Sequence, residues 1–128
     1  MNNKKMAGKL LTYTYVVFLF AIGFDKIVQT DLISSWQILV GPLTRFLLPF
    51  LSLGSIVMLE GVIEIALGIL LLTRFKIAAL GFLVVTIAIV IVDLFMLHYY
   101  NLAIREIILV VGCFAMYLLD ERTAELEF

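Results

Sequence analysis

Four long apolar segments occupy most of this chain, and they constrain its fold more than any other feature. They cover about residues 10–28, 46–73, 77–97 and 102–119, and hydrophobic residues make up 64% of the 128 in the sequence. A helix needs roughly 20 apolar residues to cross a bilayer, whereas buried strands are usually about 4–8 residues long. We therefore expect one transmembrane domain, spanning residues 1–128 and built as an all-α four-helix bundle.

The connections between these segments are short, except for one. Residues 29–48 are too polar to span a membrane but apolar enough to lie on its surface, so we expect a short interfacial helix there. Asp31 could cap that helix, Trp36 suits the headgroup level, and Gly41-Pro42 should break the chain. Pro49 then fits the first turn of the second span, where its missing N–H is tolerated.

The distribution of Lys and Arg predicts the orientation of the bundle. Cytoplasmic ends of membrane spans carry an excess of these residues. Placing both termini in the cytoplasm leaves only Lys26, Arg45 and Arg105 outside. The cytoplasmic side then carries Lys4, Lys5, Lys9, Arg74, Lys76 and Arg122. We therefore expect a multi-pass protein of the bacterial cytoplasmic (inner) membrane with both termini in the cytoplasm.

Seven charged side chains lie within the apolar segments or at their ends. A charge at the bilayer centre costs about 2.5–3.5 kcal/mol on insertion scales, and such residues usually face the bundle interior. At 1.5 Å per residue, Glu60 should lie about 18–20 Å from the outer end of its span, with Glu64 one turn deeper. The others lie nearer the outer ends, which predicts a polar cavity that faces outward. The candidates for binding a ligand or a proton are Glu60, Glu64, Asp93, Arg105, Asp25 and Lys26; no catalytic residue can be assigned.

The sequence also predicts how these charges pair. Asp93 and Arg105 flank a tight turn at similar depths, so we expect an ion pair between them. Glu60 has no basic residue at its own depth. It should therefore be protonated at neutral pH, or hydrogen-bonded to Ser, Thr or Tyr, because a lone buried carboxylate is costly. The candidate partners of Lys26 are Asp25, Glu106 and Asp93.

A structural interpretation competes with each functional one. Interhelical ion pairs can simply lock a small bundle together. Glu60 and Glu64 share a helical face and could bind a cation, but no nearby His or Cys completes a metal site. His98 fits an interfacial residue better than a ligand. The lone Cys113 fits a small packed residue, and it argues against a thiol–disulfide enzyme acting through its own cysteines.

Gly54, Gly61 and Gly68 recur every seven residues along the second span. Small residues on one stripe allow helices to approach closely in lipid. The contact could lie within one chain or between two copies in a homo-oligomer, and the sequence leaves both open.

Two motifs resemble those of the DoxX-like family of small four-helix bacterial membrane proteins. The first, Gly23-Phe24-Asp25-Lys26-Ile27, is similar to the family element G-x-x-K-[LI]. The second, which runs from Gly61 through Glu64 and Gly68 to Leu72, is similar to G-x-x-E-x-x-x-G-x-x-L-L. The resemblance covers most of the chain and implies a membrane component of redox or sulfur metabolism. One branch of the family resembles a quinone-reducing subunit, which makes a quinone the candidate cofactor, although no cofactor is certain. The chain has a single cysteine where the better-defined enzymes have a pair, and we expect no attached soluble domain of the kind that those enzymes carry.

Three function classes follow. The first is an accessory or anchoring subunit that helps a partner oxidoreductase meet the quinone pool. The second is a protein that binds or moves a small molecule or a proton through the outward polar cavity. The third is a structural interaction module without a ligand, and an enzyme acting alone is least favoured. The expected partners are the lipid bilayer, a membrane or soluble oxidoreductase and a second copy of the chain, but no nucleic acid.

Overall fold

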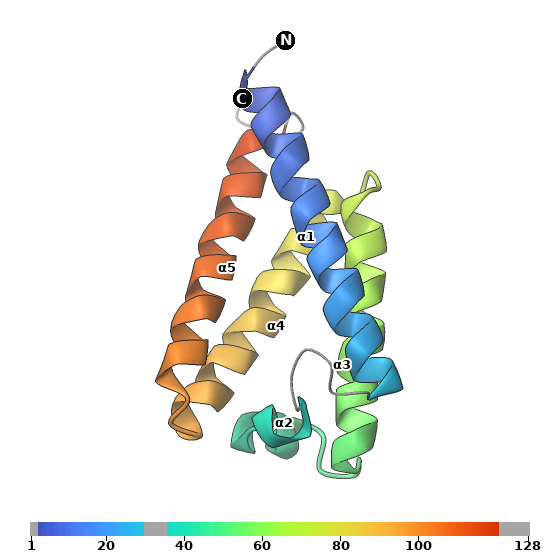
Figure 1. The fold of residues 1–128 in the computed structure, drawn as a ribbon, viewed down its shortest axis with the longest axis vertical. Coiled ribbons are helices and arrows are strands. Elements are labelled where there is room, and N and C mark those ends of the chain that lie inside the picture. The colour runs from blue at the N-terminus through green and yellow to red at the C-terminus, as the bar shows by residue number, and fades with distance from the viewer. Residues whose placement is uncertain (1–2, 30–35, 121–128) are drawn as a thin grey trace.

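A computed structural model describes residues 3–29 and 36–120 of the chain. It contains four long helices: α1 (Asn3–Val28), α3 (Leu53–Leu71), α4 (Lys76–Met96) and α5 (Tyr100–Leu119). Two short elements, the 3-10 helix η1 (Trp36–Leu39) and α2 (Pro42–Leu47), lie across one end of the bundle, and the chain termini lie at the other (Figure 1). No strand occurs within these residues. The predicted all-α four-helix bundle is confirmed.

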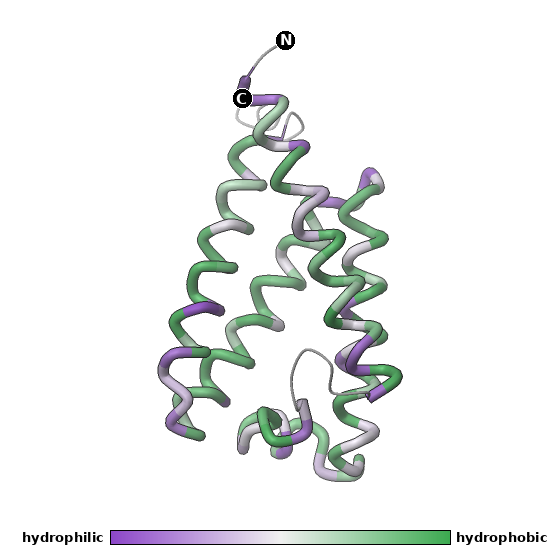
Figure 2. Tube along the Cα trace, in the orientation of Figure 1, coloured by the Kyte–Doolittle hydropathy of each residue, from purple (hydrophilic) through white to green (hydrophobic). Residues whose placement is uncertain are grey.

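The long helices carry their apolar side chains on the outside as well as the inside. All four are long and apolar enough to cross a membrane, and hydrophobic residues run along each of them (Figure 2). Val17, Phe82 and Val111 are each more than 60% exposed. Helices that are hydrophobic all round belong in lipid, so the chain is a multi-pass membrane protein.

The first two spans differ from the prediction at their starts. α1 begins at Asn3 rather than near residue 10, so the lysines before the apolar run are helical too. The second span was predicted to begin at residue 46, which is wrong. The helix of residues 42–47 ends there, and α3 starts at Leu53, where the Ser52 hydroxyl accepts a hydrogen bond from the Ser55 N–H. Pro49 therefore lies between two helices instead of in the first turn of a span.

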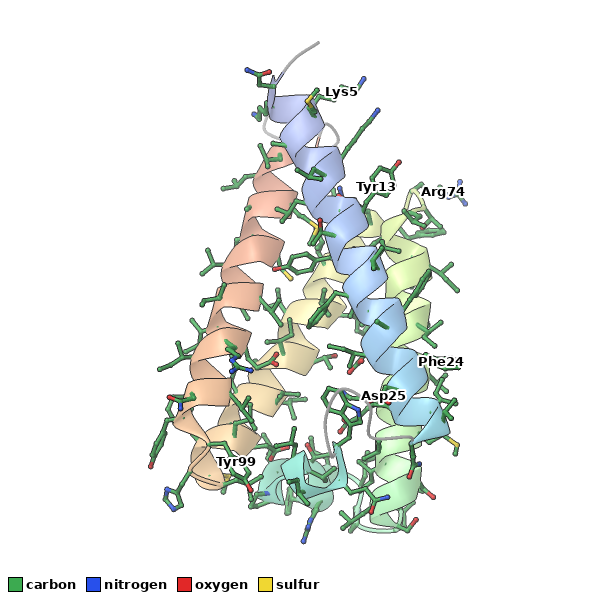
Figure 3. All side chains as sticks on the ribbon, in the orientation of Figure 1. Lys5, Tyr13, Phe24, Asp25, Arg74 and Tyr99 are labelled. Carbon is green, nitrogen blue, oxygen red and sulfur yellow. The ribbon has the colours of Figure 1, made fainter. Side chains whose placement is uncertain are left out.

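The described part of the segment between the first two spans, residues 36–52, holds two short elements where one helix was expected. Pro42 occupies the first turn of α2, where a missing N–H costs little, so the Gly41-Pro42 pair opens a helix rather than only breaking the chain. Asp31, predicted to cap a helix, lies outside the described residues. Figure 3 shows Tyr99 toward this end of the bundle and Arg74 at the opposite end.

The glycine stripe of α3 packs against α1 of the same chain. A β-carbon on Gly61 would lie 2.6 Å from the Gly23 carbonyl oxygen, and one on Gly68 would lie 2.8 Å from the Phe20 ring. Gly54 lies against Gln29, at the end of α1. Close backbone approach needs residues without a side chain at the crossing. The stripe therefore serves the contact within one chain, one of the two alternatives that the sequence left open.

Replacing Gly61 with alanine should push α1 and α3 apart and lower the free energy of unfolding by about 1–3 kcal/mol, the usual effect of overpacking. Gly81, on α4, has no atom within 4 Å of a built β-carbon. Gly81→Ala is thus the matched control and should be neutral or stabilise by up to about 1 kcal/mol. Thermal unfolding in detergent, followed by circular dichroism, compares the two variants. Equal midpoints would contradict this account of the contact.

A tight turn joins α4 to α5. The Tyr99 N–H donates to the Leu94 carbonyl and the His98 N–H to the Phe95 carbonyl, and His98 has a φ of 65°. This is the Schellman pattern, with His98 in the left-handed position that glycine usually takes. The His98 side chain is exposed and pairs with the Tyr100 hydroxyl at 2.8 Å.

On α5 itself, Cys113 is 1% exposed and lies in the core, as expected for a packed residue.

Candidate functional site

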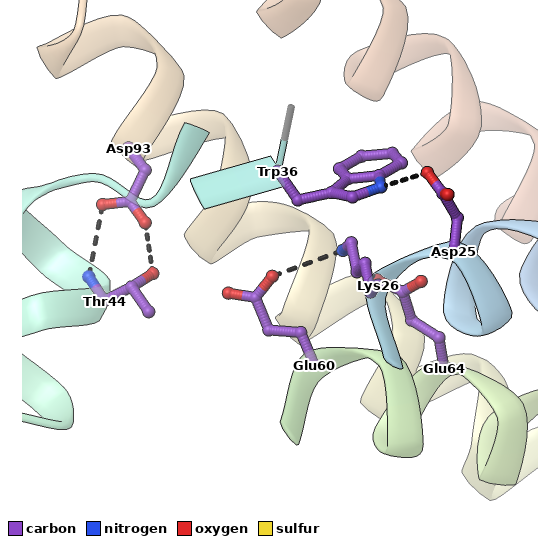
Figure 4. A network of polar contacts seen from close by, with 7 residues as sticks. All are labelled: Asp25, Lys26, Trp36, Thr44, Glu60, Glu64 and Asp93. Carbon is purple, nitrogen blue, oxygen red and sulfur yellow. Dashed lines mark hydrogen bonds and ion pairs between the residues drawn. The ribbon is translucent and has the colours of Figure 1, made fainter. Parts of the chain in front are cut away.

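Lys26 lies at the centre of a buried ion cluster formed by α1 and α3. Its ammonium nitrogen, Nζ, lies 3.3 Å from Glu60 Oε2 and also donates to Glu64 Oε1 (Figure 4). The three side chains are 7%, 24% and 12% exposed, respectively. One ammonium group thus serves two carboxylates that lie one helical turn apart.

The glycine contact explains why these charges meet. A β-carbon on Gly61 would lie 3.0 Å from the β-carbon of Lys26, so Lys26 passes α3 at the level between Glu60 and Glu64. The expectation that Glu60 has no basic partner is wrong, because α3 begins at Leu53 rather than near residue 46. Glu60 then lies about 10 Å inside its helix instead of about 18–20 Å.

This cluster lies within the membrane rather than at its surface. Thr12 of α1 accepts a hydrogen bond from Lys76, the first residue of α4, which marks one end of the bundle. Lys26 is about four helical turns, or about 21 Å, further along α1, which leaves it inside a hydrocarbon core about 30 Å thick. Unpaired charges at this depth would be strongly unfavourable, so the mutual pairing is what allows all three residues there.

Trp36 joins η1 to the same cluster. Its indole N–H donates to Asp25 Oδ2 at 2.7 Å, and its ring lies 4.8 Å from Lys26 Nζ (Figure 4). An aromatic face over an ammonium group is a favourable cation–π contact. Asp25 and Lys26 are neighbours on α1, so one turn of that helix holds both contacts. Of the predicted candidates, Asp25, Lys26, Glu60 and Glu64 therefore form one site.

Asp93, on α4, belongs to a separate site, where its carboxylate binds the first turn of α2. Its Oδ1 accepts from the Leu43 N–H at 2.8 Å and from the Thr44 N–H at 3.2 Å, while the Thr44 hydroxyl donates to its Oδ2. The predicted Asp93–Arg105 ion pair is therefore wrong. Gly41, the N-cap of α2, has no side chain to bind the free N–H groups of the first turn, and the carboxylate from α4 takes that part.

A cavity of about 380 Å³ lies beside the ion cluster, between α1, α4 and α5, with Trp36 and Leu39 of η1 among its lining residues. Its walls are mainly apolar. The charged residues that line it are Lys26, Glu64, Arg105 and Glu106. Within residues 3–29 and 36–120, no hydrogen bond or ion pair involves Arg105. The cavity differs from the predicted one, because its walls are mainly apolar rather than polar and Glu64 rather than Glu60 lines it.

Sequence reasoning did not find the contributions of Trp36 and Thr44. Trp36 was interpreted only as a headgroup anchor, although an indole N–H in a membrane needs an acceptor and Asp25 is close in the chain. Nothing in the sequence links Thr44 to Asp93, because the contact depends on how α2 lies against α4. In the part of the chain that the structure describes, no group of three His, Cys, Asp or Glu side chains could hold a metal ion.

No protein-family model matches the sequence, and neither a curated protein nor a solved structure matches it significantly. The likeness to the DoxX-like family therefore stays a prediction that rests on its two motifs. In the structure, those motifs face each other: Gly23 touches Gly61, and Lys26 binds Glu64.

Proposed function

We propose that this protein binds a small, mostly apolar molecule in the cavity between α1, α4 and α5. The observation that carries the proposal is the cavity itself. Its volume of about 380 Å³ falls within the roughly 300–1,000 Å³ typical of ligand pockets. Apolar walls with a few charged groups match a ligand that has an oily body and one polar end.

A quinone has this chemistry. Its carbonyl oxygens accept hydrogen bonds, and Arg105 and Lys26 are donors on the cavity lining. Its isoprenoid chain would lie against leucine and isoleucine side chains such as Leu83 and Ile87. We therefore propose that the protein is an accessory or anchoring subunit that helps a partner oxidoreductase meet the quinone pool. The DoxX-like motifs support the same function.

For this function we propose the bacterial inner membrane, with both termini in the cytoplasm. Support comes from the excess of Lys and Arg at the end where the termini lie. Lys9 of α1 and Lys76 of α4 both lie at that end. A cytoplasmic reporter fused to either end should be active, and activity from only one fusion would contradict the orientation.

Proton binding is a second candidate, and one observation favours it. Within the described residues, Glu64 Oε2 is buried and has no hydrogen-bond partner. One ammonium shared by two carboxylates leaves this oxygen able to hold a proton or to accept a donor from a ligand. A purely structural module is less well supported, because neither this oxygen nor Arg105 is used to hold the bundle together.

Trp36 provides a direct test of ligand binding. It is the only tryptophan of the chain and it lines the cavity. A short-chain quinone that enters should quench its fluorescence in a saturable manner. Filling the cavity with Val90→Phe should weaken the binding by about tenfold or more, which corresponds to about 1.4 kcal/mol.

Quinones also dissolve in detergent micelles, so the control must report on partitioning. Val85 lies on the same helix as Val90 but is 58% exposed and does not line the cavity. Val85→Phe adds the same ring on the outside and should leave the binding curve unchanged. Equal, unsaturable quenching in the wild type and both variants would show that the micelle, and not the cavity, holds the quinone.

A further inference from the structure

A second cavity lies at the opposite end of the bundle, where α1 begins and α5 ends. It measures about 370 Å³ and is formed by the beginnings of α1 and α4, the end of α3, Leu119 at the end of α5 and Asp120 directly after it. It is much more polar than the first cavity. Its polar lining consists of Lys5, Lys9, Thr12, Tyr13, Lys76 and Asp120. Three of these are basic and one is acidic, so the lining formed by the described residues carries a net positive charge.

Five of the six polar residues of this cavity fall into two sets. Lys76 is buried; its Nζ donates to Thr12 Oγ1 at 2.7 Å and lies 3.3 Å from Asp120 Oδ2. These three groups satisfy one another and form the floor. Lys9 and the Tyr13 hydroxyl make no such contact within the described residues. They lie one helical turn apart on α1, so both can donate to the same ligand.

We propose that this second cavity binds the phosphodiester headgroup of an anionic phospholipid, with Lys9 and Tyr13 as its donors. Basic pockets between transmembrane helices are suited to acidic headgroups. Lys9 would supply the charge and Tyr13, labelled in Figure 3, a hydrogen bond.

The position of the site in the membrane fits a lipid better than a free anion. Lys76 begins a span, so its level marks the boundary of the hydrocarbon core on this side. Lys9 lies about one turn beyond Thr12, at the depth of the headgroups. Next to the cavity the surface is apolar: Leu72, Ile69 and Val17 are each at least 53% exposed. An acyl chain can lie along this surface while its phosphate occupies the cavity.

Native mass spectrometry of the full chain, purified free of lipid in detergent, tests the proposal. The probes are phosphatidylglycerol and phosphatidylcholine with identical acyl chains. The protein should retain phosphatidylglycerol preferentially. Lys9→Gln should weaken that binding about fivefold, the effect expected of one lysine near an anionic surface. Lys9 is exposed, so its variant should keep the wild-type unfolding temperature.

Lys4→Gln is the matched control, because Lys4 is an exposed lysine of the same helix that does not line the cavity. It should leave the preference nearly intact. Equal retention of the two lipids, or equal losses in the two variants, would overturn the proposal in favour of general charge attraction. A third arm adds inorganic phosphate: if it displaces phosphatidylglycerol at matched concentration, the site binds free phosphate rather than lipid, and the proposal fails.

Discussion

Replacing Lys26 with methionine is expected to lower the free energy of unfolding by about 3–5 kcal/mol, the usual result of removing one partner from a buried ion pair. Methionine fills a similar volume but leaves Glu60 and Glu64 without a cation inside the membrane. The loss should appear as a lower midpoint in denaturation of the detergent-solubilised protein. Circular dichroism is preferable to tryptophan fluorescence as the readout, because Lys26 contacts Trp36, the only tryptophan, and its replacement would change the fluorescence directly.

The expected rescue separates charge from packing. If the loss comes from the stranded carboxylates, adding Glu60→Gln and Glu64→Gln to Lys26→Met should restore most of the stability, since neutral replacements of buried ion pairs are often tolerated. Lys9→Met, at an exposed position of the same helix, should change little. A single Lys26→Met variant as stable as the wild type would show that the cluster is not needed to hold α1 against α3.

Replacing Asp93 with alanine should have the second largest effect, a loss of about 2–3 kcal/mol. The N–H groups of Leu43 and Thr44 and the Thr44 hydroxyl would lose their acceptor. An unsatisfied buried group costs about 1–3 kcal/mol, and the total stays near this figure because the Leu43 N–H is only part-buried and the Thr44 hydroxyl can turn to another acceptor. Because these donors all belong to α2, the damage should be local. Hydrogen exchange at the amides of Leu43 and Thr44 should become faster, while exchange along α1 stays near the wild-type rate.

Two further variants separate the contributions of the Asp93 carboxylate and the Thr44 hydroxyl to this contact. Asp93→Asn keeps one acceptor oxygen and should lose less stability than Asp93→Ala. Thr44→Val removes only the hydroxyl donor and should leave both amides protected. Unchanged exchange in Asp93→Ala would mean that α2 is held by its apolar contacts instead.

Much of the fold could be predicted because it depends on composition. Apolar runs of membrane-spanning length specify four helices whatever their partners are. The start of the second span could not be placed in this way. Pro42 and Pro49 can each begin a helix, and the structure places the start of α3 after both of them, at the N-cap Ser52. That one error in the boundary also moved the expected depth of Glu60.

The candidate site was predicted in its residues but not in its contacts. Lys26 and Glu64 stand out because charges within apolar helices are rare. Their pairing follows from the crossing of α1 and α3 at Gly23 and Gly61, which the glycine spacing indicates without naming the partner helix. Asp93 illustrates the opposite case. Its nearest charge along the following helix is Arg105, yet its oxygens face a short helix that lies about 50 residues earlier in the chain.

The short segment across the end of the bundle, η1 and α2, links α1 to α4. It is anchored to α1 where Trp36 binds Asp25, and to α4 where Thr44 binds Asp93. α1 packs mainly against α3, and α4 packs mainly against α5. The first cavity occupies the space between these two helix pairs. The width of this cavity at its η1 end is therefore set by two carboxylates and the chain between them, rather than by the packing of helix against helix.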